Sequence, residues 1–588
     1  MNSTPEHPER SVEGPVDSTP IDHDSAAHPE AVAERAERRD AALKAHHRSR
    51  RWRGRALAAA AGTGAVALVT GVAVVGSLVP ASAPVVDGSA QPALLAATGM
   101  TAVCPPTPQL PEGADEGTDA EFTPVSRSAE SATRVVMLSD LAGRFPGATL
   151  GPVTPDASQP QTLTEPQPAE VQQGSPATAG EDGVPVQQAS VHAVDAPGTE
   201  FGAATVAALE PLGGQMPVAS AVLSYSAGDG DLAGLAASAC QSPSHRHWLS
   251  GATTTLGTTS ILTVVNPSVS AATVDLELYG AEGPVEAPGT TGIVLAPGAS
   301  TSLILGGLAP DQEHLAVAVH ASGGAVSAGI QQHRLDGATP AGVDLIQASA
   351  TPTRLAVLPG VRVPTEQVLD GLSDPAAGPS VMIAAPISSG PVTAEVVVSG
   401  AGGEVPLPGE SSVSLQPGST ARVPLDGLSS GEYTVTVLAD APVLASSHGL
   451  EATDAELPEG STGRPLDTAI MSAAEPLGLE QLVAVPDNGP AALILSSVDG
   501  GTVEVAPVLA DGSVGEPHLQ ELDSGAHVRL PVDSLTEADA EVAGLLITTT
   551  TAGQVHAGLT VRSAQGITAV PVPAQQEAPA GVPVRVQP

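Results

Sequence analysis

Sequence motifs that recur at a fixed distance are the feature that most constrains the fold of this chain. The segments ATVDLELYG and VTAEVVVSG align with Thr273 and Thr393 placed 120 residues apart. The Leu-X-Pro-Gly motifs that begin at Leu295 and Leu415 are separated by the same distance. A weaker third copy contains Thr502 in the segment TVEVAPVL. Because the period is about 110 to 120 residues, we predict tandem domains rather than the short units of a solenoid.

Hydrophobic and polar residues alternate within each copy. Val274, Leu276 and Leu278 alternate with Asp275 and Glu277, a pattern typical of a strand with one buried face. Aromatic residues make up only 1% of the chain, so the cores must be built from Val, Leu, Ile and Ala, which favours many thin strands. We therefore predict a mainly β fold of tandem immunoglobulin-like β-sandwich repeats. A β-propeller-like array with two blades per repeat is the alternative.

One uncharged segment predicts the location of the chain in the cell. Residues 56–79 contain no charge, and about 20 apolar residues suffice to cross a bilayer as a transmembrane helix. Five arginines lie immediately before this segment, and no basic residue follows it until Arg127. The positive-inside rule then places the N-terminus in the cytoplasm and the rest of this single-pass protein outside the cell membrane. The residues that set this topology are Arg48, Arg50, Arg51, Arg53 and Arg55.

A cleaved signal peptide is the alternative to this signal anchor. The sequence Ala81-Ser82-Ala83 resembles a cleavage site. However, the apolar stretch exceeds the usual 7 to 15 residues or so of a signal peptide, and the leader before it is about 55 residues long. We therefore expect the segment to remain in the membrane.

The negative charge lies almost entirely beyond the predicted span. The net charge of the chain is -42, while acidic and basic residues balance up to Arg55. An acidic surface repels phosphate backbones, so we expect no nucleic acid partner. Such a surface is also common in proteins that are merely soluble.

The two cysteines agree with an exported region. Cys104 and Cys240 are the only cysteines and both follow the predicted span. A single pair in an oxidising compartment is most simply a disulfide. Two free thiols are the alternative, but no CxxC spacing or nearby basic group supports a reactive pair.

These patterns predict seven regions along the chain. They are a disordered cytoplasmic leader with a basic juxtamembrane segment (1–55), a transmembrane helix (56–79), a disulfide-bracketed β region with a Pro-rich loop at 151–188 (90–250), three β-sandwich repeats (251–350, 351–460 and 461–575) and a disordered tail (576–588).

The order of several motifs resembles a known family. The predicted span is followed by a CPP motif at Cys104, by Cys240 and Trp248, and by a strand that ends in Asn266-Pro267 before the run ATVDLELYG. This order resembles the actinobacterial domain of unknown function 5719 family. The later copies depart from it because they lack the Asn-Pro pair. The resemblance implies an exported, membrane-tethered envelope protein and no established activity.

Few residues suggest chemistry. His245 and His247 flank Arg246, and two imidazoles at positions i and i+2 of a strand share a face. Without a third ligand at a recognisable spacing, a polar strand start beside Cys240 is the better interpretation. Asp229 and Asp231 begin like a calcium loop but lack the later oxygen ligands, so we expect a turn.

Other catalytic patterns are missing from the sequence. There is no GxSxG motif, and the only lysine, Lys44, precedes the span. The scattered His314, His320 and His333 are expected at the surface. We therefore expect no catalytic residue, no metal ligand and no cofactor.

Three functions remain open from the sequence. We favour a non-catalytic scaffold or binding module of the cell envelope, which reaches a cell-wall or envelope protein partner through loops or strand edges. The alternatives are an envelope enzyme with a site around His245 and His247, and an accessory subunit of a membrane-bound glycosyl-transfer system.

Overall fold

The computed structural model describes residues 98–111, 113, 124–153, 160–174, 188–195, 204–457, 463–537 and 540–573. All of them belong to one compact unit that spans Pro92–Val584. The predicted leader, transmembrane helix and tail lie outside the described residues, as do the arginines from Arg48 to Arg55. Within the described part of the chain, no helix has the length and apolar character needed to cross a membrane.

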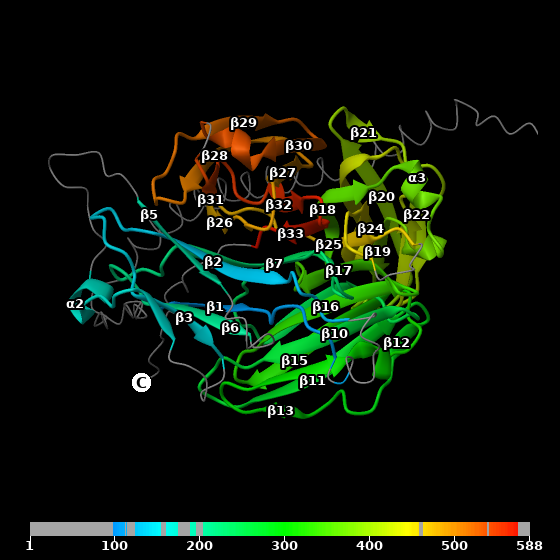
Figure 1. Ribbon diagram of the computed structural model, residues 1–588, viewed down its shortest axis with the longest axis horizontal. Helices are drawn as coiled ribbons and strands as arrows, with labels where there is room; N and C mark the ends of the chain where they lie inside the picture. Colours follow the sequence, from blue (N-terminus) through cyan, green and yellow to red (C-terminus); the bar gives the residue numbers. More distant parts are fainter. Residues whose placement is uncertain are drawn as a thin grey trace, which may run out of the picture. The chain divides into compact units, whose positions relative to one another are not determined.

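The described residues form antiparallel sheets, as the alternating pattern predicts, and these sheets divide the chain into four modules (Figure 1). Module 1 contains two sheets of four strands. Their orders are β5-β2-β7-β8 and β1-β6-β3-β4. Its elements are β1 (Met100–Cys104), β2 (Glu130–Leu138), β3 (Ala148–Pro152), β4 (Gln161–Thr164), α2 (Ala169–Gln172), β5 (Ala189–Asp195), β6 (Thr205–Leu209), β7 (Ala219–Ala227) and β8 (Gly234–Ala239).

Module 2 repeats this plan with the orders β14-β10-β16-β17 and β12-β11-β15-β9. Its elements are β9 (Arg246–Ala252), β10 (Thr258–Val265), β11 (Ala272–Gly280), β12 (Gly283–Val285), β13 (Ile293–Leu295), β14 (Ser300–Ile304), β15 (Leu315–Gly323), β16 (Ser327–Asp336) and β17 (Thr339–Gln347).

Module 3 has the same plan, but one long strand, β24, belongs to both of its sheets. Its elements are β18 (Thr353–Val363), α3 (Glu366–Leu369), β19 (Ser380–Ala384), β20 (Val392–Gly400), β21 (Gly403–Val405), β22 (Ser412–Leu415), β23 (Thr420–Pro424), β24 (Gly431–Ala452) and β25 (Leu466–Ser472).

Module 4 completes the set with the orders β30-β27-β32-β33 and β26-β31-β28-β29. Its elements are β26 (Glu480–Ala484), β27 (Ala491–Ser497), β28 (Gly501–Leu509), β29 (His518–Leu522), β30 (Ala526–Pro531), β31 (Val542–Thr549), β32 (Val555–Arg562) and β33 (Ile567–Pro571).

The repeated motifs occupy equivalent places in modules 2, 3 and 4. The three copies form β11, β20 and β28, each of which lies second from one edge of its sheet. The turns that follow β13, β22 and β29 contain Gly298, Gly418 and Gly525, with φ values of 71°, 74° and 75°. Because this left-handed conformation favours glycine, the Leu-X-X-Gly pattern marks the same turn in each copy.

Module 1 is a fourth copy that the sequence pattern does not show. Its strands have the same order as those of the other modules. The segment 151–188, predicted as a Pro-rich loop, contains β4 and α2, and β4 pairs with β3. The sheets also assign β9 to module 2 and β25 to module 3, whereas the predicted boundaries leave most of β9 and all of β25 in the neighbouring regions.

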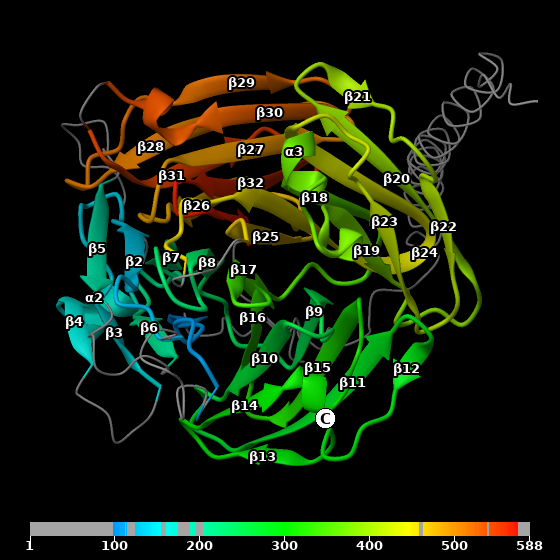
Figure 2. The ribbon, with the colours of Figure 1, turned by 45° about the vertical axis from the view of Figure 1, so that its right-hand side comes forward.

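The last strand of each module contributes to two hydrophobic cores, which links the modules in a circle. Val343 and Leu345 of β17 pack into the core of module 1, and Ile470 of β25 packs into that of module 2. Ile567 of β33 joins the core of module 3, and Leu235 of β8 joins that of module 4. Because β8 of the first module reaches the core of the last, the circle closes. In Figure 2, β8, β17 and β25 lie between the differently coloured modules.

Sheets of neighbouring modules also face one another. Val136 of β2 packs with Leu482 of β26 across the junction of modules 1 and 4. Trp248 of β9 packs with Met382 of β19 across the junction of modules 2 and 3. Sheets therefore face each other both within modules and between them.

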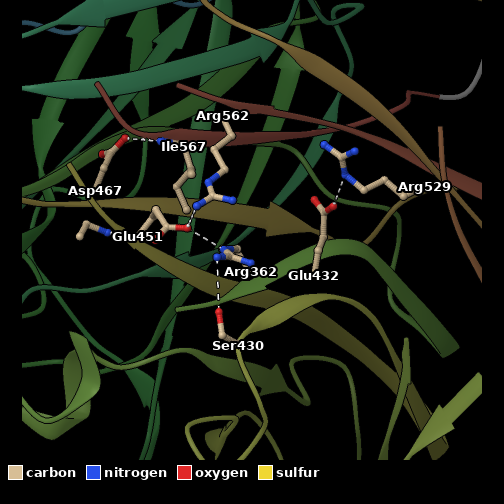
Figure 3. A network of polar contacts seen from close by, with 9 residues as sticks. Arg362, Ser430, Glu432, Glu451, Asp467, Arg529, Arg562 and Ile567 are labelled. Atoms are coloured by element: carbon tan, nitrogen blue, oxygen red, sulfur yellow. Dashed lines mark hydrogen bonds and ion pairs between the residues drawn. The ribbon is translucent and has the colours of Figure 1, made fainter. Parts of the chain in front are cut away.

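Ion pairs join the modules away from the centre. In Figure 3, Glu451 of β24 lies between Arg362 of β18 and Arg562 of β32. Glu451 Oε2 lies 2.7 Å from Arg362 Nε and 2.9 Å from Arg562 Nη2. At the junction of modules 1 and 4, Arg134 Nη2 donates to Glu541 Oε1 at 2.6 Å. Charged groups thus reinforce the junction of modules 3 and 4 and that of modules 1 and 4.

Polar side chains fill the centre of the circle, where the last strands meet. The carboxylate of Asp467 is fully buried and accepts hydrogen bonds from the backbone N–H groups of Leu235, Val343 and Ile567, at 2.9, 3.1 and 2.9 Å. A methyl group at Gly566 would overlap this carboxylate. One side chain of module 3 therefore holds strands from the three other modules.

Asp344 of β17 is the second buried carboxylate at the centre. It accepts hydrogen bonds from the backbone N–H of Ile470 at 2.6 Å and from the hydroxyl of Thr568 at 3.0 Å. Burial raises the pKa values of Asp344 and Asp467 well above the usual range, although these hydrogen bonds lower them. Burying these two carboxyl groups costs desolvation free energy, and the hydrogen bonds that they accept offset part of that cost.

Replacing Asp467 by Asn should destabilise the protein. An amide presents an oxygen to some of the three backbone donors, but its NH2 group then faces at least one of them. Leaving a buried donor unsatisfied costs about 2 kcal/mol, which denaturant unfolding measures. The matched control is Asp533→Asn, because Asp533 is exposed and its substitution should change little. A stable or stabilised Asp467→Asn variant would show that the buried charge costs more than its hydrogen bonds contribute.

Candidate functional site

A cavity of about 340 Å³ opens at the end of the central axis. The strands β8, β17, β25 and β33 all end there, and the segments that follow them form its walls. Its lining includes Gln241 after β8, Ser349 after β17, Glu475 after β25 and Pro573 after β33. All four modules therefore contribute to one site, which we call the axial cavity. Its volume lies at the lower end of the range for small-ligand sites.

Side-chain amides fix the walls of the axial cavity. Gln347 Oε1 accepts a hydrogen bond from the backbone N–H of Ala239 at 3.0 Å, and its Nε2 donates to the carbonyl of Pro571 at 3.1 Å. Gln241 Nε2 donates to the carbonyl of Ala348 at 3.3 Å. Because each of these contacts joins two modules, the walls are held in place before any ligand arrives.

The disulfide lies beside the axial cavity. The structure joins Cys104 of β1 to Cys240, the residue that follows β8, as the sequence predicts. Cys240 lines the cavity, and both cysteines are buried. The bond therefore ties the first strand of module 1 to the strand that closes the circle.

The sequence HRHW begins β9 at the rim of the axial cavity. Arg246 is exposed, whereas His247 is buried and its Nε2 donates to the carbonyl of Val326 at 2.7 Å. Burial lowers the pKa of His247, although this hydrogen bond raises it. A buried imidazole already bound to a carbonyl is a poor candidate for a metal ligand or general base. The exposed His245 therefore has no imidazole partner for shared chemistry.

Metal binding finds no further support in the described residues. Across these segments, no three His, Cys, Asp or Glu side chains are gathered closely enough to hold a metal ion. Asp229 accepts hydrogen bonds from Ser126 and Ser128. Burial raises the pKa of Asp229, but these hydrogen bonds outweigh it and lower the pKa to about 2. Asp229 therefore fixes the neighbouring segment of chain.

Hydroxyl groups lie beside imidazoles at two other places. Ser190 Oγ is 2.8 Å from His192 Nε2, and Thr434 Oγ1 is 2.9 Å from His527 Nδ1. Thr434 and His527 are buried, and neither pair lines the axial cavity. Neither pair therefore places an activated hydroxyl nucleophile in the axial cavity.

Asn266 of the Asn-Pro pair has a structural role. It is fully buried, and its Nδ2 donates to the carbonyls of Ser270 and Leu295 at 2.9 and 3.1 Å. Its Oδ1 accepts from the backbone N–H of Ser268 at 3.0 Å. The pair therefore fixes the turn that follows β10.

The histidines expected at the surface are not all exposed. His333 lies in β16 and is only 5% exposed. The expectation of a surface residue is therefore wrong for His333, because the strand pattern assumes one solvent face and β16 has neighbours on both. Burial lowers the pKa of His333 to about 4. Burial likewise lowers the pKa of His314 to about 4.

The buried His333 should make stability depend on pH. Its folded pKa of about 4 lies below the ordinary histidine pKa of 6.5, so the unfolded state binds a proton first as the pH falls. The contribution of His333 to the free energy of unfolding is complete above pH 6.5. It falls by about 1.4 kcal/mol per pH unit as the pH decreases toward 4. A His333→Gln variant should therefore show a shallower loss of stability over this range in denaturant unfolding.

The matched control for this measurement is the exposed His245→Gln, which should keep the original slope. The buried carboxylates Asp344 and Asp467 oppose the histidine effect, since their raised pKa values favour the folded state at low pH. Both carboxylates are present in the parent protein and in the two variants, so their effect cancels when the slopes are compared. An unchanged slope in His333→Gln would contradict the assignment.

Comparisons with known proteins identify a family and no activity. A comparison with curated proteins gives no match. Residues 195–533 match the description "Family of unknown function (DUF5719)", and this range covers more than half of the chain. It begins at the end of β5 and includes the strand motifs that repeat in modules 2, 3 and 4. The chain therefore belongs to the DUF5719 family.

Proposed function

We propose that this protein is a membrane-anchored, non-catalytic binding module of the cell envelope, and that its ligand occupies the axial cavity. The observation that carries the proposal is the convergence of all four modules on one preformed cavity. Concave sites with a few fixed polar groups are the usual location of ligands. We further propose that the modules are pairs of blades in a propeller-like array, which suits a site on the axis.

The compartment proposal has separate support. The uncharged segment 56–79 follows a block of arginines, a pattern that orients a single span with its C-terminal side outside. The disulfide between Cys104 and Cys240 is also typical of proteins in oxidising compartments.

An envelope enzyme based on His245 and His247 has less support. His247 lines the axial cavity, but it is buried and its Nε2 already donates to the carbonyl of Val326, so it is poorly placed to act on a substrate. A role as an accessory subunit of a glycosyl-transfer system stays compatible with a binding module, since both require a partner or ligand at this surface.

Reporter fusions test the predicted topology. Alkaline phosphatase fused after Pro588 should be active in cells, because the enzyme requires export, whereas a fusion after Arg55 lacks the span and should be inactive. Cells that show activity only from a cytoplasmic reporter at Pro588 would contradict the membrane orientation.

Photocrosslinking tests the axial cavity in the full chain in its own membrane. A benzophenone amino acid at Thr351, which lines the cavity, should give a specific crosslinked product. The same probe at the exposed Asp533 in module 4, outside the cavity, is the matched control and should not give it. Identical products from both positions, or none from Thr351, would contradict binding in the cavity.

A further inference from the structure

Three linkers between modules frame the axial cavity. Residues 240–245 connect modules 1 and 2, residues 348–352 connect modules 2 and 3, and residues 473–479 connect modules 3 and 4. In a closed circle of four modules, the first and third linkers lie on opposite sides of the axis. Arg246 is the first residue of β9, directly after the first linker, and Glu475 belongs to the third linker. A positive and a negative side chain, from two different linker regions, therefore line one cavity.

Neither charge is neutralised within the described residues. Arg246 Nε lies 3.2 Å from His320 Nδ1, and its guanidinium is 6.0 Å from the ring of Trp248, but no carboxylate reaches ion-pair distance among the described segments. The side-chain carboxylate of Glu475, which also lines the cavity, likewise makes no ion pair with a described residue. Other arginines of the same region do form such pairs, as Arg362 does with Glu451 at 2.7 Å. The two rim charges are therefore available to a ligand.

The remaining walls of the axial cavity are neutral. They present hydroxyl groups such as Ser242 and apolar side chains such as Met216 and Leu482. Among the described residues that line the cavity, Trp248 is the only Phe, Tyr or Trp, and it is 4% exposed and packs between two modules. The cavity therefore offers no open aromatic face for stacking against a sugar ring, and its specific contacts must come from polar groups.

The charge of the whole chain narrows the choice of ligand. A net charge of -42 repels polyanions over distances of about 10 Å. A molecule with one anionic and one cationic end has no net charge and avoids this repulsion. Its two ends match the two opposite charges in the lining, Arg246 and Glu475.

We propose that the axial cavity binds the termini of a short peptide, with the carboxylate paired to Arg246 and the ammonium group paired to Glu475. This inference rests on the proposed function of the cavity as a ligand site and adds the chemical class of the ligand. Charge-assisted hydrogen bonds at both ends provide the affinity and the orientation.

Intrinsic fluorescence tests this inference in the full chain in detergent. The chain has two tryptophans, Trp52 and Trp248, so a Trp52→Phe background leaves Trp248 in the cavity wall as the reporter. The probes are trialanine, its N-acetylated and C-amidated form, and maltotriose. Trialanine should change the emission with saturation, and the capped peptide should bind about a hundredfold more weakly, because it lacks both charges and each charge pair contributes about tenfold.

Charge-removing variants assign the two ends. Glu475→Gln should weaken trialanine binding about tenfold and leave binding of the capped peptide unchanged, and Arg246→Gln should do the same. The matched control is Glu504→Gln, at an exposed position in β28, which should bind trialanine like the parent protein.

Each other outcome overturns the inference. Equal binding of the capped peptide, or a response to maltotriose alone, would keep the cavity as a ligand site and reject the charged peptide termini. If none of the three probes changed the emission, the peptide assignment would fail, and the crosslinking experiment at Thr351 would then decide whether the cavity binds a ligand at all.

Discussion

The structure depends on the hydrogen bonds made by the backbone N–H groups along one edge of β8. This is the edge that lies nearest the central axis and has no neighbouring strand among the described residues. A buried strand edge without a partner leaves N–H groups unpaired, which is costly. The N–H groups of Leu235, Ala237 and Ala239 are instead accepted by Asp467, Thr568 and Gln347, at 2.9, 3.0 and 3.0 Å. These acceptors come from modules 3, 4 and 2. Side chains of the three other modules thus take the place of a neighbouring strand.

This arrangement makes the modules depend on one another. Both faces of β8 are buried, because Ala236 faces its own core and Leu235 faces that of module 4. In an isolated module 1, one of these faces and the whole inner edge would meet water. The short side chains in GLAASA also suit a strand that touches neighbours on every side. The closed circle is therefore the state in which the last strands are stable, which agrees with the single compact unit.

The sequence predicts the strands better than it predicts their assembly. Alternation in ATVDLELYG identifies β11 because that strand has one solvent-facing side, with Asp275 and Glu277 exposed. The same rule misleads for Asp467 of β25, since a lone Asp among apolar residues is typical of an outward position, and only the circle buries it. Module 1 escapes detection because β3, ATLGP, lacks alternation. At the axial cavity, the sequence HRHW is recognisable as a possible site motif. Glu475 lies in a linker, and no neighbouring residue in the sequence indicates that it lines a cavity.

Gln347 connects the stability of the circle to the candidate site. Its side chain hydrogen-bonds to Ala239 of β8 and to the carbonyl of Pro571, and it also lines the axial cavity. Since the lining comes from all four modules, the cavity exists only while the circle is closed. A ligand that binds there must favour the closed state by mass action. The same hydrogen bonds that hold the last strands therefore determine whether there is a site to occupy.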